Sequence, residues 1–275
     1  MIKNHRNKND YYYAGNGLWV RNFMKKSAAP IDINNLIPEA DMMTMLNNES
    51  NNHNKMLQRI DTETISHDKI AIIADGYKFT EKHKLLEILP SDVVVIGIGE
   101  TLARWESSRK MQYYIVNNPF DDCLHLLPKQ QKVFPKCIAS MRTNPGFVEK
   151  FNGIVYSYSP TPTTTFSGQK PEADYLIDDY RNPICAAVGV AYRFSVQKLL
   201  LICCDDVYKE HRPATEKLNN GLWMYPQQKV AHDLIDGNLY WLKTANIKLG
   251  YCSEGPEYKN AGYIAEGDIA KFFAE

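Results

Sequence analysis

Acidic residues and a histidine stand where the sequence could place catalytic groups. Asp205 and Asp206 follow directly on residues 198–204 (KLLLICC), the most hydrophobic strand-like segment of the chain. A carboxylate at the end of a buried strand is held rigidly, which suits a catalytic base or a metal ligand. His232 could act as a general acid or base near neutral pH, as could His211, although a lone histidine is also compatible with a structural or solvated role. We take Asp205, Asp206 and His232 as the candidate catalytic residues.

Small residues follow two other apolar segments and could contact a nucleotide. Asp75-Gly76 and the Gly97-x-Gly99 pair are turns in which glycine allows close backbone approach and main-chain amides attract phosphate. Neither matches the G-x-G-x-x-G or P-loop pattern, so ordinary dinucleotide or P-loop binding is not supported. Plain turns between a strand and a helix explain these residues equally well.

Amides and carboxylates gather after a further apolar segment, in the run Asn117-Asn118-Pro119 followed by Asp121-Asp122. The Asn117 and Asn118 amides could hydrogen-bond a ribose or a base edge. Carboxylates such as Asp121 could hold a divalent cation, Mg²⁺ being the candidate, or ribose hydroxyls. An Asn-Pro turn with solvated acids is the competing interpretation.

Other candidate donor-binding residues lie near predicted strand ends. Arg142, Tyr156 and Tyr158 border the irregular segment 159–168 (SPTPTTTFSG), whose length is typical of a lid. A guanidinium and hydroxyls there could neutralise a leaving phosphate in a site without metal. Ser253 and Glu254 follow the last apolar segment and complete the predicted set.

The positions of these residues depend on a regular alternation of elements. Helices are expected at 80–89, 100–108, 182–194 and 227–245, and a polar excursion at 211–223. The segments that predict buried strands are 69–74, 92–98, 112–117, 136–141, 153–158, 198–204 and 247–252. Alternating strands and helices indicate an α/β fold, a mostly parallel Rossmann-like sheet with helices on both faces. In such sheets ligands bind outside the carboxyl ends of the strands.

The first 68 residues differ from this pattern and predict an N-terminal basic and aromatic extension with a linker, preceding a transferase-like domain at 69–275. Residues 1–30 hold six lysines and arginines against one aspartate, together with five aromatic residues. Such a segment could bind nucleic acid, or it could pack its aromatic rings on the domain. Residues 40–47 predict a short helix, and the Asn-rich segment 47–54 a surface loop.

The overall composition limits the class of protein. Net charge is zero and hydrophobic residues make up 44% of the chain, which excludes a disordered or uniformly cationic protein. No apolar run approaches the roughly 20 residues of a membrane span, and no signal-peptide core follows Met1. The six cysteines form no C-x-x-C motif and are interpreted as buried thiols. We expect a cytoplasmic protein.

Four passages carry a resemblance to a known group: residues 70–82 (IAIIADGYKFTEK), 93–122, 182–208 and 232–264. In these passages the chain resembles the motility accessory factor and archaeal hydroxymethylpterin diphosphokinase (MptE-like) group, and more distantly the bacterial sialyltransferases of Rossmann-like fold. The first turn departs from the group, since Asp75-Gly76-Tyr77-Lys78 stands where Gly-Pro-Ser is preferred.

The resemblance implies a nucleotide-dependent transferase, with a glycosyltransferase using a nucleotide-sugar donor as the first hypothesis. A diphosphokinase using a nucleoside triphosphate would need Mg²⁺ on carboxylates such as Asp121, Asp205 and Asp206. A third hypothesis keeps the transferase and makes the acceptor a modified base in nucleic acid, as in viral DNA glycosyltransferases. A non-catalytic nucleotide-binding module is the fourth.

Overall fold

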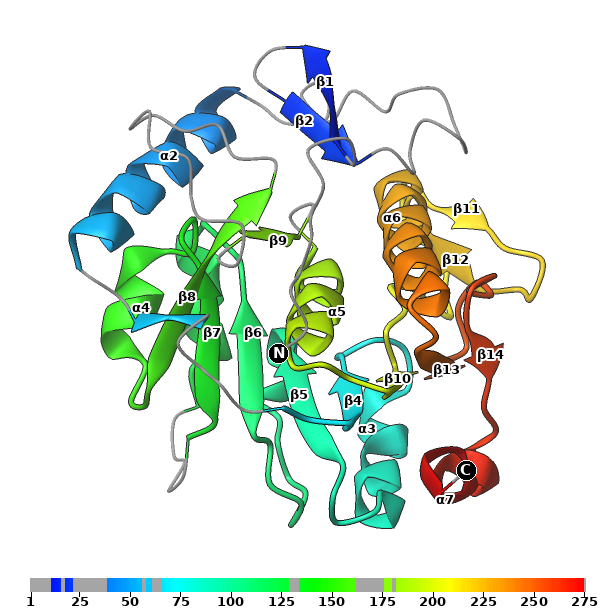
Figure 1. Ribbon diagram of the computed structural model, residues 1–275. Helices are drawn as coiled ribbons and strands as arrows, with labels where there is room; N and C mark the ends of the chain where they lie inside the picture. Colours follow the sequence, from blue (N-terminus) through cyan, green and yellow to red (C-terminus); the bar gives the residue numbers. More distant parts are fainter. Residues whose placement is uncertain are drawn as a thin grey trace.

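A parallel sheet is the centre of the computed structural model, which describes residues 11–15, 18–21, 39–55, 58–60, 66–128, 134–161, 176–179 and 182–274 (Figure 1). Helices cover both faces of the sheet, which confirms the predicted α/β, Rossmann-like fold. Within these residues the sheet has ten strands: β3 (Gln58–Arg59), β4 (Lys69–Ile73), β5 (Val94–Ile98), β6 (Tyr113–Val116), β7 (Lys136–Ser140), β8 (Val155–Thr161), β9 (Leu176–Asp178), β10 (Lys198–Ile202), β13 (Lys248–Cys252) and β14 (Gly262–Tyr263).

The order of the strands sets where a ligand can bind. They lie in the order β14-β13-β10-β4-β5-β6-β7-β8-β3, with β9 also pairing with β8. Each of these pairs is parallel. From β4 the chain moves outward in one direction through β8, and then returns to place β10 on the other side of β4. The strand order therefore reverses between β4 and β10.

Side chains alternate between the two faces and build separate cores. Ile70 and Ile72 of β4 pack in the core that includes residues of α5 and α6, whereas Ala71 and Ile73 face the core of α3, η4 and α7. α5 lies close to the sheet because it is rich in small residues, and its first turn is capped by the Asn182 side chain. The helices and 3-10 helices around the sheet are α3 (Phe79–Lys82), η4 (His83–Ile88), η5 (Gly99–Thr101), η6 (Asp121–Leu126), α4 (Pro145–Lys150), α5 (Pro183–Arg193), α6 (Pro226–Thr244), η8 (Glu266–Asp268) and α7 (Ile269–Ala274).

The predicted surface loop at 47–54 is wrong, because these residues continue the helix α2 (Glu39–Asn54). Asn48 and Asn52 lie one turn apart and are buried. The Asn48 amide donates to the carbonyls of Pro119 and Arg142, at 2.7 and 3.2 Å. The Asn52 amide donates to those of Met141 and Thr143, at 2.9 and 2.7 Å. Polar side chains thus attach α2 to the loops that follow β6 and β7, although the predicted division assigned α2 to the N-terminal extension.

Other elements differ in extent from the predictions. The helix expected at 100–108 is reduced to the single turn η5, and the one at 80–89 is mostly the 3-10 helix η4. β8 continues to Thr161, so the start of the predicted lid is strand, and its remainder lies outside the described residues.

Two short hairpins and the helix lengths complete the description of the fold. One hairpin pairs β1 (Tyr11–Gly15) with β2 (Leu18–Arg21). The other pairs β11 (Glu216–Lys217) with β12 (Trp223–Met224), in the predicted excursion. Among the described helices, none combines the length and apolar character that crossing a bilayer requires.

Candidate functional site

The loops after β4 and β10 meet at the reversal of strand order. In open α/β sheets this is the position of the ligand crevice. Gly76 donates its N–H to the Cys203 carbonyl at 3.1 Å. A Cβ at Gly76 would lie 2.2 Å from the carbonyl oxygens of both Cys203 and Asp205. Glycine is required here because the two loops are in direct backbone contact.

The loop after β5 completes this edge of the sheet. Gly99 has a φ of +63°, in the left-handed region that glycine adopts without strain. A Cβ there would lie 2.1 Å from Asp75 Oδ1, so the Asp75 carboxyl lies directly against the Gly99 backbone. The predicted glycines therefore differ in role, because Gly97 is buried inside β5 and faces Met111 and Thr101.

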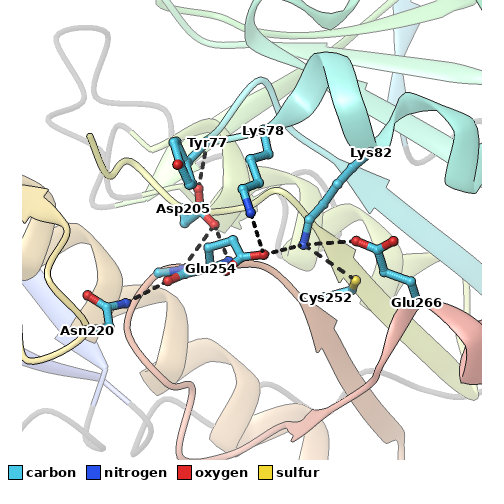
Figure 2. A network of polar contacts seen from close by, with 9 residues as sticks. Tyr77, Lys78, Lys82, Asp205, Asn220, Cys252, Glu254 and Glu266 are labelled. Carbon is cyan, nitrogen blue, oxygen red and sulfur yellow. Dashed lines mark hydrogen bonds and ion pairs between the residues drawn. The ribbon is translucent and has the colours of Figure 1, made fainter. Parts of the chain in front are cut away.

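Asp205 joins the ends of three strands (Figure 2). Its Oδ1 accepts the N–H of Tyr77 at 2.8 Å, and its Oδ2 accepts the N–H groups of Glu254 and Gly255 at 2.9 and 3.2 Å. Burial raises the pKa of Asp205, and these three hydrogen bonds oppose that rise. With both oxygens engaged, Asp205 is placed to hold the loops after β4, β10 and β13 together.

Asp75 and Asp206 follow β4 and β10 at the same edge of the sheet, and with Asp205 they form what we term the carboxylate cluster. Desolvation raises the pKa of Asp206 to about 6, and repulsion by Asp75 and Asp205 adds to the effect. The Asp206 side chain nevertheless remains open to solvent at the strand end. Asp75 is half-buried, and desolvation raises its pKa against the hydrogen bond from the Glu100 backbone. Like charges in partly desolvated surroundings are typical of functional sites.

Two lysines, Lys78 at the end of the first turn and Lys82 at the end of α3, lie beside Glu254, whose N–H binds Asp205. Lys78 Nζ and Lys82 Nζ are each 3.5 Å from Glu254 Oε1, and Lys82 Nζ is also 3.7 Å from Glu266 Oε1 (Figure 2). Burial alone would lower the pKa of Lys82, but Cys252, Cys203 and the two glutamates outweigh it, and the pKa is raised. Neither lysine was among the candidates, because only the fold brings them to the Ser-Glu-Gly turn.

Two other predicted residues have buried polar atoms without partners. Among the described residues, neither Asn117 Nδ2 nor Ser253 Oγ has a hydrogen-bond partner. Both follow strands of the sheet at its carboxyl edge, β6 and β13 respectively. Unsatisfied buried polar atoms are costly, so both are candidates for contact with a bound nucleotide.

The Asn-Pro turn accounts for the residues next to Asn117. Asn118 accepts the Phe120 N–H at 2.9 Å and donates to Asp122 Oδ1 at 3.0 Å. Asp121 accepts the Asn144 amide at 2.8 Å. No group of three or more histidine, cysteine, aspartate or glutamate side chains able to hold a metal ion occurs in the part of the chain described. A metal role for Asp121 has no support from neighbouring ligands there.

Arg142, Tyr156 and Tyr158 lie on the side of the sheet away from β10. Arg142 is buried, with Nε 3.3 Å from Glu49 Oε2. Tyr158 donates to Asp179 at 2.8 Å. Tyr156 is the second residue of β8, so its predicted position near the carboxyl end is wrong. Because β5, β6 and β7 separate β8 from β4, the fold does not bring these residues to the carboxylate cluster.

His232 is linked to the loop after β10 through the ring of Tyr258. It is buried and stacks on Tyr258, with ring centroids 4.3 Å apart and planes at 15°. Its Nε2 is 3.1 Å from the Pro256 carbonyl, so Nε2 carries the proton that it donates. Burial lowers the pKa of His232. The Tyr258 hydroxyl donates to the Cys204 carbonyl, next to Asp205. By packing on Tyr258, His232 therefore stabilises the loop that carries Asp205.

The other residues with reactive side chains, His211 and the cysteines, have contacts that fit a structural role. His211 is exposed in the excursion and packs edge-on against Trp223, with ring centroids 4.6 Å apart. All six cysteines are free and buried, which confirms their interpretation as thiols. Burial raises the pKa of Cys123 to about 12, so this thiol stays protonated at neutral pH and is a poor nucleophile.

Comparison with known proteins supports the fold. No family model matches the sequence, and no curated protein matches it. The structure is similar to that of a MAf glycosyltransferase from Magnetospirillum magneticum AMB-1, with a TM-score of 0.58 and 17% sequence identity. The match covers 79% of this chain and 38% of the neighbour, so the chain spans well under half of the neighbour's length. At this identity the likeness extends to the fold alone.

Proposed function

We propose that this chain is a glycosyltransferase that moves a sugar from a nucleotide-sugar donor to a hydroxyl acceptor at the carboxyl ends of β4 and β10. The observation that carries the proposal is Asp206, an exposed carboxylate with a pKa of about 6 at the reversal of strand order. A base whose pKa lies near the working pH is well matched to removing a hydroxyl proton.

The reaction assigns separate roles to the cluster. Asp206 takes the proton of the acceptor hydroxyl while the oxygen of that hydroxyl forms a bond to the anomeric carbon. The bond from that carbon to the donor phosphate breaks, and the nucleotide leaves with the electron pair. Asp75 keeps the pKa of Asp206 high by repulsion, and Asp205 positions the loops.

The structural neighbour adds support of a general kind, since it is named as a glycosyltransferase of similar fold. The resemblance to the MptE-like group belongs to the same proposal and concerns the same nucleotide site. Asn117 and Ser253, whose buried polar atoms lack partners, are assigned to the nucleotide. Asp75, Gly76 and Gly99 are assigned to the turns around it.

Release of nucleotide from a panel of nucleotide sugars, with and without hydroxyl acceptors, tests the proposal. We expect turnover with at least one donor, and a loss of 100-fold or more in Asp206→Asn, in keeping with removal of a catalytic base. Asp92→Asn is the matched control, because exposed Asp92 pairs with Lys69 at the amino ends of the strands. An Asp206→Asn protein as active as Asp92→Asn rules out Asp206 as the base.

The diphosphokinase is the second candidate, favoured by the mutual repulsion of Asp75 and Asp206, which a divalent cation would relieve. Those two carboxylates would hold Mg²⁺, because both oxygens of Asp205 accept backbone hydrogen bonds. Conversion of ATP to AMP in the presence of Mg²⁺, without sugar release, identifies this activity.

Two further hypotheses use the same site differently. A nucleic-acid acceptor would be contacted by residues 1–30, most of which lie outside the described residues, so this partner stays a prediction. Loss of DNA affinity and of its salt dependence on deletion of residues 1–30 tests it. Nucleotide affinity with no turnover of any donor indicates a binding module.

A further inference from the structure

Lys78 has an unusual backbone at the end of the first turn, directly before α3. Its φ and ψ are 63° and 17°, the left-handed region that L-residues with a Cβ rarely adopt. Such a conformation at a non-glycine residue often marks a functional position. The turn Asp75-Gly76-Tyr77-Lys78 leads directly from β4 to α3, so Lys78 is displayed at the reversal of strand order.

The contacts of Lys78 are those of a cation that can move. Its ammonium lies 3.5 Å from Glu254 Oε1, its one ion pair among the described residues, and 5.6 Å from the centre of the Tyr77 ring. About a third of the side chain is exposed. Lys82 is 97% buried by contrast, and lies between Glu254 and Glu266. If Lys78 leaves, Glu254 keeps the Lys82 ammonium as its partner (Figure 2).

A ligand phosphate at this edge needs a cation. The carboxylate cluster repels a phosphate, and each other described basic side chain beside Asp75 has partners of its own. Arg104 contacts Glu100 at 3.3 Å and the Thr80 hydroxyl at 2.6 Å. Lys82 is enclosed. Lys78 is therefore the cation that can turn toward a phosphate without breaking a second ion pair.

We propose that Lys78 exchanges its contact with Glu254 for the diphosphate of a bound nucleotide, while Lys82 keeps the charge of Glu254 neutralised. This site deepens the proposed function, on which it rests, by naming the group that receives the leaving phosphate. Glu254 acts as the resting partner of Lys78 and competes with the ligand for it. Removing the Glu254 charge therefore strengthens phosphate binding, and removing Lys78 weakens it.

Binding of inorganic pyrophosphate to the full chain, measured by calorimetry at low salt, tests the exchange. We expect Lys78→Gln to lower the affinity tenfold or more and Glu254→Gln to raise it severalfold. Lys84→Gln, which removes an exposed lysine of η4, should leave the affinity unchanged. Absence of pyrophosphate binding in the unmodified protein, or equal affinities in Lys78→Gln and Lys84→Gln, overturns the proposal.

A second variant separates binding from folding. Lys78→Gly removes the cation and also relieves the left-handed backbone, so the melting temperature should stay equal or rise while pyrophosphate affinity falls. A fall in melting temperature with unchanged affinity would assign Lys78 a structural role instead. Pyrophosphate binding through Lys78 without turnover of any donor overturns only the glycosyltransferase. Turnover with a donor KM that Lys78→Gln does not change overturns only the exchange.

Discussion

Asp206→Asn should make the protein more stable at neutral pH while it removes activity. The folded state raises the pKa of Asp206 from 3.8 to about 6, so the folded protein holds this proton more tightly than the unfolded chain. Stability therefore falls as pH rises from 3.8 to about 6, and is constant above that window as far as this group is concerned. Asparagine carries no charge, so the Asp206→Asn protein does not lose stability in this way.

The size of the gain follows from the pKa. A change of one in pKa corresponds to about 1.4 kcal/mol, which sets an upper limit of about 3 kcal/mol for a rise from 3.8 to about 6. Asp206 is open to solvent, which screens the repulsion, so we expect a gain of about 1 kcal/mol at pH 7. The gain should become much smaller at pH 4, where the carboxyl is protonated in the folded protein and about half protonated in the unfolded chain.

Urea unfolding of both proteins between pH 4 and 8 measures the difference. Asp92→Asn provides a control of opposite sign, because the hydrogen bond from Lys69 lowers the pKa of Asp92. That carboxylate contributes stability above its unfolded pKa, and its loss should slightly destabilise the protein at pH 7. The reasoning is refuted if Asp206→Asn is no more stable than the unmodified protein at pH 7, or if its gain is the same at pH 4.

Three further substitutions test the supports of the site. Asn52→Ala leaves two buried carbonyls without the Asn52 donor and should lower the free energy of unfolding by about 2–4 kcal/mol, measured in urea. Asn51→Ala, on the exposed face of α2, should leave it unchanged. Equal losses in the two variants would contradict the assignment. Gly76→Ala should cost about 2 kcal/mol or more by calorimetry, because its Cβ meets two carbonyl oxygens, whereas Gly267→Ala has open space. Tyr258→Phe should cost about 1 kcal/mol and reduce kcat with little change in donor KM; unchanged kcat would separate the His232 stack from catalysis.

The sheet was predictable because its strands are buried on both faces. KLLLICC and KIAIIA are continuous apolar runs, and a run of this length has few alternatives to a central parallel strand. Carboxylates directly after such runs lie at the carboxyl edge of the sheet, and Asp75, Asp205 and Asp206 are there in the structure. The helix predicted at 100–108 is wrong, because the chain makes only one helical turn after Gly99. Short polar segments between strands have too few apolar residues to predict a helix reliably.

Roles that depend on distant partners could not be read from the sequence. Asp205 is a support because its three donors come from two other loops, 128 and about 50 residues away. The Asn-rich segment 47–54 predicts a surface loop, because runs of polar residues usually face solvent. Its buried amides instead bind carbonyls about 90 residues away. Lys78 and Lys82 lacked any motif, and the pairing of strands alone brings them to Glu254.

The asparagines of α2 bind main-chain carbonyls, which every type of residue presents. Substitutions in the loops at 119 and 141–143 leave those acceptors in place, whereas substitution of Asn48 or Asn52 removes a donor. Selection on this contact therefore acts on the helix and leaves the loops free to diverge. Across homologues the contact should show invariant asparagines opposite variable loop sequences, with no correlated exchange between the two sides.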